Sequence, residues 1–302
     1  MSAPRVSVLM PAYNERFFAA ALASARAQTY AALEIVVCDD SPGAAIEAAV
    51  RAAGDARVRY QRNSSRLGFG GNFTECLHQA RGELIKFLND DDLLEPQCVA
   101  ALAAAFDYDP RVTLATSRRI AIDANGAAVQ GHLASQPIAH VSCLIPGLEL
   151  GNFVLINSVN FIGEPSTAMF RKRDVQPEAR GLFAWGGRDY HCLADLSLWL
   201  RLLARGSAFY QAVALSEYRV HGGQQQADET MDVACIAERY ELARQARHHG
   251  FLADPQHFRA AIAMPLAMAQ QALRERSLAA GARAELEKLA AIITGELATP
   301  AG

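Results

Sequence analysis

The sequence lacks the cysteine patterns of a metal site or a disulfide framework. Its six cysteines lie at positions 38, 76, 98, 143, 192 and 235, with no CxxC pair and no metal-ligand spacing among them. In a chain of this length, isolated cysteines are typical of free thiols inside a reduced protein. The prediction is six free and mostly buried thiols.

The sequence also lacks an excess of positive charge and a long hydrophobic segment. The net charge is −3 over 302 residues, which disfavours nucleic acid as a partner. The N-terminal stretch MSAPRVSVLM has neither the basic region nor the apolar stretch of a signal peptide. The apolar run AAIAMPLAMAQQAL at 260–273 is too short to cross a bilayer. A cytoplasmic protein without a transmembrane segment is expected, with peripheral membrane contact still open.

Phosphate-binding loops of the best-known kinds are missing as well. The absence of GxxxxGK[ST] excludes a P-loop NTPase. The stretch GFGGN at 68–72 precedes a helical pattern, but it lies outside the first βαβ unit and lacks the full dinucleotide-binding spacing. We interpret it as a flexible loop at a helix N-terminus, a place where a phosphate can bind.

What the sequence does contain is a regular alternation of strand and helix patterns. Hydrophobic residues make up 51% of the chain, enough for a full core. Strands are predicted at 5–10, 33–38, 58–62, 83–88 and 112–117, and helices at about 15–28, 43–53, 71–81 and 96–106. This order predicts βαβ units around a mostly parallel sheet. A hairpin with Asn125-Gly126 as its turn is predicted at 119–130.

The last quarter of the chain has a different composition. From residue 227 it is rich in Ala, Arg and Glu with helical periodicity. Before this region, a further helix is predicted at about 195–205. Three helices, near 228–249, 255–275 and 278–297, are predicted to form an extension without a chemical motif. It is expected to pack on the core or on a second copy of the chain, so a homodimer through these helices is one possibility.

Polar residues follow three of the predicted strands. The first strand is followed by PAYNE at 11–15, the second by Asp39, Asp40 and Ser41, and the fourth by NDDD at 89–92. Each group by itself is also compatible with helix capping. Because ligands bind at the carboxyl ends of strands in open α/β sheets, three such groups on one edge favour a shared ligand site.

An ordered set of segments resembles the inverting family 2 glycosyltransferases of the GT-A fold. These segments are VSVLMPAYNE, LEIVVCDDS, ARGELIKFLNDDDLLEP, LADLSLWLRLLARG and YRVHGG, and they span roughly residues 4–222 in the family's order. The resemblance implies a Rossmann-like, mixed and mostly parallel sheet flanked by helices. It also implies a GT-A domain at 1–224, with a nucleotide-sugar half at 1–117 and an acceptor half at 118–224, followed by the helical extension at 225–302.

The resemblance further implies a reaction. A sugar would move with inversion from a nucleoside-diphosphate sugar, a UDP- or dTDP-sugar being favoured, to a hydroxyl of a saccharide, a lipid-linked or another acceptor. Such enzymes act in polysaccharide, glycolipid or glycoconjugate biosynthesis. A divalent Mn²⁺ or Mg²⁺ held by carboxylates would neutralise the charge that gathers on the diphosphate leaving group.

The resemblance also implies roles for particular positions. Asp91 and His221 would bind the metal, and Asp195, with Arg201 six residues later, would be the general base. Asp195 is alternatively a helix N-cap, and His221 a plain surface histidine. Nucleotide-sugar contacts are expected at Pro11, Ala12, Tyr13, Glu15, Asp39, Asp40, Arg66, Asn72, Asn89, Asp90 and Arg219.

The acidic motif departs from the family pattern at its first position. Asn89 stands where the family usually has an acid, which leaves the metal or sugar contact of that position open. Asp92 has the spacing of a capping box with Glu95, although Pro96 suits the first helical residue better. We therefore expect Asp92 to shape the turn into the next helix and not to bind metal.

Two other functions are compatible with these features. A sugar-1-phosphate nucleotidyltransferase also combines a Rossmann-like sheet with acidic metal ligands, but the stretch MPAYNERFF lacks its Gly- and Arg-rich loop. A catalytically inactive nucleotide-sugar binding protein would be explained by Asn89 and by the altered segment HGGQQQ. Donor binding without transfer would distinguish it from an enzyme.

Overall fold

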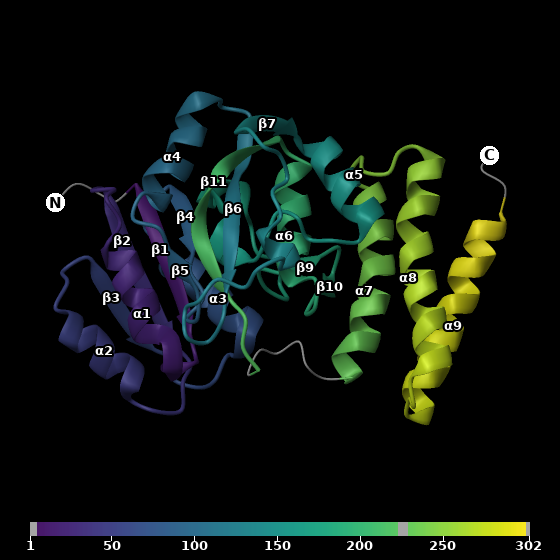
Figure 1. Cartoon of the computed structure of the whole chain (residues 1–302), viewed down its shortest axis with the longest axis horizontal. Helices are drawn as coiled ribbons and strands as arrows, with labels where there is room; N and C mark the ends of the chain where they lie inside the picture. The colour runs from purple at the N-terminus through teal and green to yellow at the C-terminus, as the bar shows by residue number, and fades with distance from the viewer. Residues whose placement is uncertain (1–4, 223–228, 300–302) are drawn as a thin grey trace.

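A mixed β-sheet forms the centre of the molecule, with the C-terminal helices side by side at one end (Figure 1). The computed structural model describes residues 5–222 and 229–299. Within them the main sheet has the strand order β3-β2-β1-β4-β8-β6-β11-β5, with β7 paired to β11. Its strands are β1 Val6–Ala12, β2 Leu33–Asp39, β3 Val58–Arg62, β4 Leu84–Phe87, β5 Leu93–Leu94, β6 Val112–Ile122, β7 Cys143–Pro146, β8 Met169–Arg171 and β11 Ser207–Arg219. A small hairpin joins β9 Ala184–Trp185 to β10 Arg188–Asp189.

Helices cover both faces of this sheet because the strands are apolar on both sides. Along β1, Val6 and Val8 belong to one hydrophobic cluster and Leu9 to another. The cluster of Val6 includes α1 and α4, and the cluster of Leu9 includes α3, α5, α6, α7 and α8. The helices are α1 Glu15–Arg26, α2 Ala45–Ala53, α3 Gly68–Gln79, α4 Cys98–Tyr108, α5 Gly147–Asn157, α6 Ala194–Leu203, α7 Glu229–Arg247, α8 Pro255–Glu275 and α9 Ala280–Ala298. Short 3₁₀ helices are η1 Leu133–Ser135, η2 Pro165–Thr167 and η3 Lys172–Asp174.

The predicted order of strands and helices is confirmed, and β1 pairs in parallel with β2 and β4. The predicted hairpin at 119–130 is reduced to one antiparallel bridge between Ile122 and Ala128. The predicted turn is present, and it is stabilised because the Asp123 carboxylate accepts hydrogen bonds from the backbone N–H groups of Asn125 and Ala127. Helix α5 and the long strand β11 were not predicted, since their sequences carry weak periodicity.

The predicted start of the fourth helix is wrong. Helix α4 begins at Cys98, and the residue at its N-cap position is Gln97, whose side chain makes no capping hydrogen bond. Pro96 therefore precedes the helix, and Asp92 belongs to no capping box. The residues between them form the short strand β5, which pairs with β11 instead of continuing into the helix.

The extension packs on the core of its own chain. Phe251, Phe258 and Ile262 belong to the same hydrophobic cluster as Leu150 and Val154 of α5. A Cβ added at Gly151 would lie 2.2 Å from Phe251 Cε1, so the glycine permits this close approach. The expected boundary at 224–225 lies outside the described residues. No helix in the described part of the chain is both long and apolar enough to span a bilayer.

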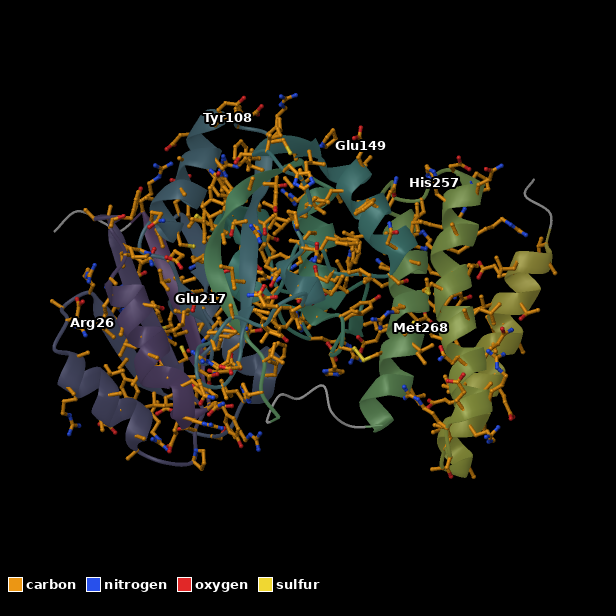
Figure 2. All side chains as sticks on the ribbon, viewed as in Figure 1. Arg26, Tyr108, Glu149, Glu217, His257 and Met268 are labelled. Carbon is orange, nitrogen blue, oxygen red and sulfur yellow. A yellow bond between two sulfur atoms is a disulfide. The ribbon has the colours of Figure 1, made fainter. Side chains whose placement is uncertain are left out.

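The prediction of six free thiols is wrong for two of them. Cys192 and Cys235 form a disulfide, visible as a yellow bond in Figure 2. They are 43 residues apart in the sequence and meet because α7 packs against the segment before α6. Cys38, Cys76 and Cys98 are free and buried, and Cys143 is free and half-buried.

Candidate active site

The polar residues predicted at the strand ends gather around one cavity of about 720 Å³. It lies where β1, β2 and β4 end, as expected for the carboxyl edge of an open α/β sheet. The predicted site residues that line it are Pro11, Tyr13, Asp40, Arg66, Asn72, Asn89, Asp90, Asp91, Asp195 and His221. The nucleotide-side residues and the candidate base, more than 100 positions apart in the sequence, therefore share one cavity.

Four predicted nucleotide-sugar contacts do not line this cavity: Ala12, Glu15, Asp39 and Arg219. Ala12 is buried in β1. Glu15 is exposed, with its carboxylate next to Gly43. Asp39 is buried and accepts hydrogen bonds from the Ser41 N–H at 2.8 Å and the Tyr60 hydroxyl at 2.7 Å. These four residues therefore do not form the cavity wall.

Arg219 stabilises the loop at residues 89–92, here called the acidic loop, and does not line the cavity. Its Nε donates to the Asp91 carbonyl at 2.8 Å, and its Nη1 donates to the Asp123 carbonyl at 2.9 Å. The guanidinium also lies over the Phe17 ring, 4.6 Å from its centroid. Burial and these bonds fix the backbone that presents Asp91 to the cavity.

Asp91 and His221 form the candidate metal site. Their Oδ2 and Nε2 atoms are 3.0 Å apart, and both side chains line the cavity. The His221 ring packs on Phe17 with 5.0 Å between centroids. Carboxylate oxygen and imidazole nitrogen are both ligands for Mn²⁺, so this pair fits the implied metal. In the described residues no group of three or more His, Cys, Asp or Glu side chains is arranged to hold a metal. The remaining ligands would come from diphosphate oxygens and water.

Asp90 joins the acidic loop to the end of β1. Its Oδ2 accepts the backbone N–H groups of Tyr13 and Asn14, both at 2.6 Å. Burial raises the pKa of Asp90 to about 6, against the lowering effect of these two hydrogen bonds. Asp90 thus holds the Pro11–Asn14 loop against the site.

Asn89, which is half-buried at the cavity wall, pairs with the buried Asp92. The Asn89 amide donates to Asp92 Oδ2 at 3.1 Å, and the Arg219 N–H donates to Asp92 Oδ1 at 2.9 Å. Only 1% of Asp92 is exposed, and burial raises its pKa well above the usual range. Asp92 therefore ties the acidic loop to β11, and the expectation that it shapes the turn into α4 is wrong. That Asp92 does not bind metal stays a prediction.

Asn89→Asp, which would restore the family's first acid, is expected to destabilise the protein. The substitution replaces a hydrogen-bond donor with a second carboxylate facing buried Asp92. We expect the free energy of unfolding to fall by about 2–4 kcal/mol, measured by urea denaturation at pH 7.5. Asn125→Asp, in an exposed turn, is the control and should change stability little. Equal stabilities of the two variants would contradict the proposed pairing.

The nucleotide side is organised by Asp40 and Asn72. Asp40 accepts the backbone N–H groups of Leu67 and Gly68, so the start of α3 is tied to the end of β2. The buried Asn72 amide donates to the Cys38 carbonyl at 3.0 Å. The GFGGN stretch is thus the first turn of α3 and not a free loop. Nearby, the Arg66 guanidinium lies 4.5 Å from the centroid of the exposed Tyr13 ring, and both line the cavity.

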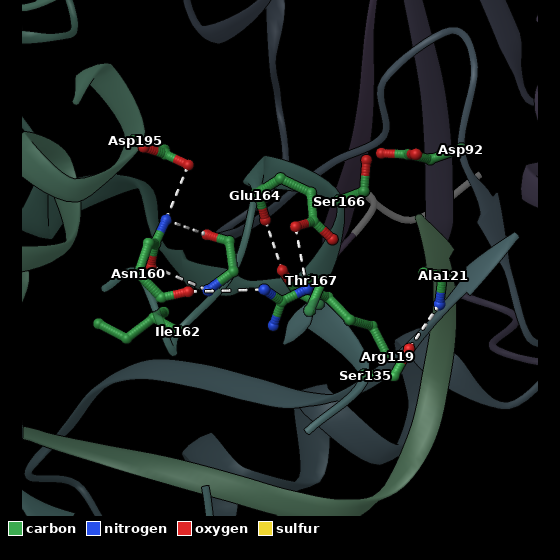
Figure 3. A network of polar contacts seen from close by, with 12 residues as sticks. Asp92, Arg119, Ala121, Ser135, Asn160, Ile162, Glu164, Ser166, Thr167 and Asp195 are labelled. Carbon is green, nitrogen blue, oxygen red and sulfur yellow. Dashed lines mark hydrogen bonds and ion pairs between the residues drawn. The ribbon is translucent and has the colours of Figure 1, made fainter. Parts of the chain in front are cut away.

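Asp195 lies on the opposite side of the cavity, in the first turn of α6. The capping interpretation is wrong, because Leu193 occupies the N-cap position. Asp195 Oδ2 accepts from the Asn160 amide at 2.9 Å, and Asn160 also bonds the Gly163 carbonyl and N–H (Figure 3). The Gly163 carbonyl accepts in turn from the Trp199 indole at 2.8 Å. A turn at 160–163 and helix α6 therefore fix the carboxylate together.

The pKa of Asp195 is raised to about 7, chiefly by burial. The nearby Glu164 carboxylate raises it further, whereas the Leu196 N–H and the Arg119 guanidinium lower it. Glu164 is itself paired with Arg119, with 3.0 Å between Oε2 and Nε. A carboxyl group with a pKa near neutrality can take a proton at physiological pH, which is what a general base requires.

Several residues at this side were not predicted individually. Arg119, Asn160 and Glu164 line the cavity, as do Ile236, Arg239 and Leu242 of α7. The segment NFIGEPS carries Asn160 and Glu164, and its run of Gly and Pro was the available signal. Arg201 does not line the cavity; it donates to the carbonyls of Leu182, Ala184 and Gln176 and holds the loop beside α6.

The fold and this site define a GT-A glycosyltransferase, and comparison with known proteins agrees. Residues 7–176 match the family model described as glycosyl transferase family 2, so the chain belongs to that family. An uncharacterized protein of Mycobacterium tuberculosis is 33% identical over 72% of this chain and 67% of its own length. A UDP-Glc:α-D-GlcNAc-diphosphoundecaprenol β-1,3-glucosyltransferase of Escherichia coli is 36% identical over 29% of this chain, a match that spans 35% of that protein.

Solved structures show the same fold at low sequence identity. Residues 1–349 of TarS from S. aureus in complex with UDP-GlcNAc superpose with a TM-score of 0.65 and 15% identity, covering 97% of this chain and 80% of that one. A mannosyltransferase from Pyrobaculum calidifontis in complex with GDP-Man and Mn²⁺ gives a TM-score of 0.55 and 17% identity, covering 98% and 84%. The fold agrees with the family match over residues 7–176, which identifies the protein as a glycosyltransferase.

Proposed function

We propose that this glycosyltransferase moves a sugar, with inversion, from a nucleoside-diphosphate sugar to an acceptor hydroxyl. The observation that carries the proposal is that one cavity is lined by the Asp91–His221 pair and by Asp195. The Asp91–His221 pair suits a diphosphate with its divalent ion, and Asp195 suits an acceptor hydroxyl. A UDP- or dTDP-sugar is the proposed donor, in agreement with the UDP-GlcNAc bound to TarS and the UDP-Glc named for the E. coli relative.

The donor side is proposed to run from Asp40, Tyr13 and Arg66 to the acidic loop. Tyr13 and Arg66 offer an aromatic face and a cation to the nucleotide. Asp91 and His221 would hold Mn²⁺ or Mg²⁺, which when bound neutralises charge on the departing diphosphate. Asp90 keeps the Tyr13 backbone in place through its two hydrogen bonds and so orients this wall.

Asp195 is proposed to activate the acceptor. Its carboxylate takes the proton as the acceptor O–H bond breaks, and the oxygen forms a bond to the anomeric carbon. The bond between that carbon and the phosphate oxygen breaks at the same time, and the nucleoside diphosphate leaves from the opposite face. The Asn160 amide holds the carboxylate in position while the proton moves.

The acceptor is proposed to be a lipid-linked saccharide, with other saccharides or hydroxyl compounds as alternatives. The E. coli relative carries a diphosphoundecaprenol acceptor in its name. On this chain the acceptor side of the cavity combines apolar groups with polar ones: Leu133, Val154, Phe161, Ile236, Leu242, Gln136 and Arg239. Such a wall suits sugar faces and a linked aliphatic chain, and would place the enzyme in polysaccharide or glycolipid biosynthesis.

A pH profile tests the base assignment. The general base acts only when it is deprotonated, and burial raises the pKa of Asp195 to about 7. We therefore expect kcat to be constant above about pH 8 and to fall tenfold per pH unit well below 7. The measurement is kcat at saturating donor and acceptor between pH 5 and 9. A profile that stays nearly flat down to pH 5, as an ordinary carboxyl group with a pKa near 4 would give, would contradict the assignment.

The class of donor can be identified by thermal shift. Binding to the folded state raises the melting temperature, so a panel of nucleoside diphosphates and nucleotide sugars, with and without Mn²⁺, should reveal the preferred base and sugar. Catalysis is then tested by transfer to a lipid-linked saccharide, with release of the nucleoside diphosphate as the measured signal. Stabilisation by a donor without transfer or slow hydrolysis would instead identify an inactive nucleotide-sugar binding protein.

A further inference from the structure

One face of α7 holds the segment that leads into α6. The Glu238 carboxylate accepts the backbone N–H groups of His191, Cys192 and Leu193, each at 2.9 Å. Only 8% of Glu238 is exposed. Three amide donors on one buried carboxylate make a strong and directional anchor, because hydrogen bonds to a charged acceptor are about twice as strong as neutral ones.

The same face of α7 makes further contacts with this segment. Cys235 forms the disulfide with Cys192, and Glu241 pairs with Arg188 at 3.2 Å. A Cβ added at Gly186 would lie 2.5 Å from the Gln245 amide, so this turn also lies directly on the helix. Positions 235, 238, 241 and 245 are three or four residues apart and therefore share one side of α7.

The held segment is close to the candidate base in both sequence and space. Leu193 precedes Asp195 by two residues, and its carbonyl accepts the Ser197 N–H, an early backbone hydrogen bond of α6. His191, Cys192 and Leu193 line the cavity together with Asp195 and with Ile236 of α7. A shift of residues 191–193 would therefore move both the acceptor wall and the start of the helix that carries the carboxylate.

We propose that α7 of the C-terminal extension contributes to the acceptor site. In this proposal Glu238 and the Cys192–Cys235 disulfide hold the segment before α6 and so position Asp195. The inference rests on the proposed function, in which Asp195 is the base. Glu238 is a positioning residue, since it touches the segment before α6 and not the reacting atoms. The extension then contributes both a wall of the acceptor site and the alignment of the proton transfer.

The expected signature is a loss of turnover without a loss of donor binding. Among the described residues, the side chains of Asp91 and Asp40 bond to residues outside α7. A small displacement of a catalytic group, by contrast, can cost on the order of 100-fold in rate. Glu238→Gln keeps the size of the side chain but leaves one acceptor oxygen for three N–H groups. The double substitution Cys192→Ser/Cys235→Ser removes the covalent link independently.

The experiment compares these two variants with the wild type and with two controls, Glu285→Gln on an exposed part of α9 and Cys143→Ser at a free cysteine. For each, kcat, the donor KM and UDP affinity are measured, with circular dichroism as the check on folding. We expect kcat to fall by about tenfold or more in Glu238→Gln and by a smaller factor in the double variant. The donor KM and the UDP affinity should stay within about twofold, and both controls should behave as wild type.

Three results would overturn the proposal, and they differ from a failure of the proposed function. Wild-type kcat in Glu238→Gln would show that the anchor does not position the base. A donor KM that rises in proportion to the loss of kcat would show a general structural role. If Glu238→Gln does not fold, an unchanged kcat in the folded double variant decides against the proposal. A wild-type protein that transfers no sugar from any donor would instead disprove the proposed function.

Discussion

Asp195→Asn is expected to lower kcat by about 10²–10⁴-fold while leaving UDP binding unchanged. Asparagine has nearly the same shape and can still accept one of the two hydrogen bonds that Asp195 receives from the Asn160 amide and the Leu196 N–H, but it cannot accept a proton from an acceptor hydroxyl. The acid limb near pH 7 should also disappear from the residual activity, because the titrating group has been removed. The measurement is steady-state transfer with UDP release as the signal, together with calorimetric titration of UDP.

The matched control is Asp189→Asn. Asp189 belongs to the same region, pairs with Arg180 at the surface at 3.1 Å and does not line the cavity. An exposed ion pair of this kind contributes little to stability, so this variant should turn over like the wild type. Normal turnover in Asp195→Asn would mean that another group removes the proton, and the base would have to be sought elsewhere on the acceptor wall.

Asp91→Asn is expected to abolish the metal dependence of donor binding. The carboxylate supplies the charge of the Asp91–His221 pair, and a neutral amide oxygen is a much weaker ligand for a hard divalent cation. We expect the affinity for UDP in the presence of Mn²⁺ to fall by about 10–100-fold, to the level that the wild type shows after treatment with a chelator. Titration calorimetry of UDP with and without Mn²⁺ measures both quantities.

Asp189→Asn again serves as the control and should retain the full effect of Mn²⁺. Folding is checked by circular dichroism, because Asp91 lies between the half-buried Asp90 and the buried Asp92. If UDP binds the wild type equally well with and without chelator, and Asp91→Asn binds it as the wild type does, the metal assignment is wrong. The Asp91–His221 pair would then be an ordinary polar contact beside the cavity.

Much of the nucleotide half follows from local sequence. Fully apolar strands such as Leu33–Asp39 have to be buried on both faces, and this requirement alone gives a sheet covered by helices. In such a sheet the residues after neighbouring strands must meet, which is why Asp40 and Asp91 could be placed at one site before the structure was known. The helices of the extension could also be predicted, because helical periodicity is a short-range property.

Contacts between distant segments could not be predicted in this way. The roles of Asn89 and Asp92 depend on β11, about 130 residues further along the chain, which covers the loop and donates an N–H to Asp92. The Cys192–Cys235 disulfide similarly depends on how α7 packs, and cysteine spacing gives no information about that. Each of these features is a property of packing, which local periodicity does not encode.

Local sequence patterns were enough to predict the class of fold, the edge of the sheet where the cavity lies, and the residue types available there. The tertiary structure places Arg219 and Asp39 outside the cavity wall, whereas Asp91, His221 and Asp195 line one cavity. It also decided that Asp195 has a pKa near 7, since burial and the neighbouring Glu164 raise it. The physical reason is that strand and helix patterns depend on near neighbours, whereas burial, charge and contact at a site depend on segments that only folding brings together.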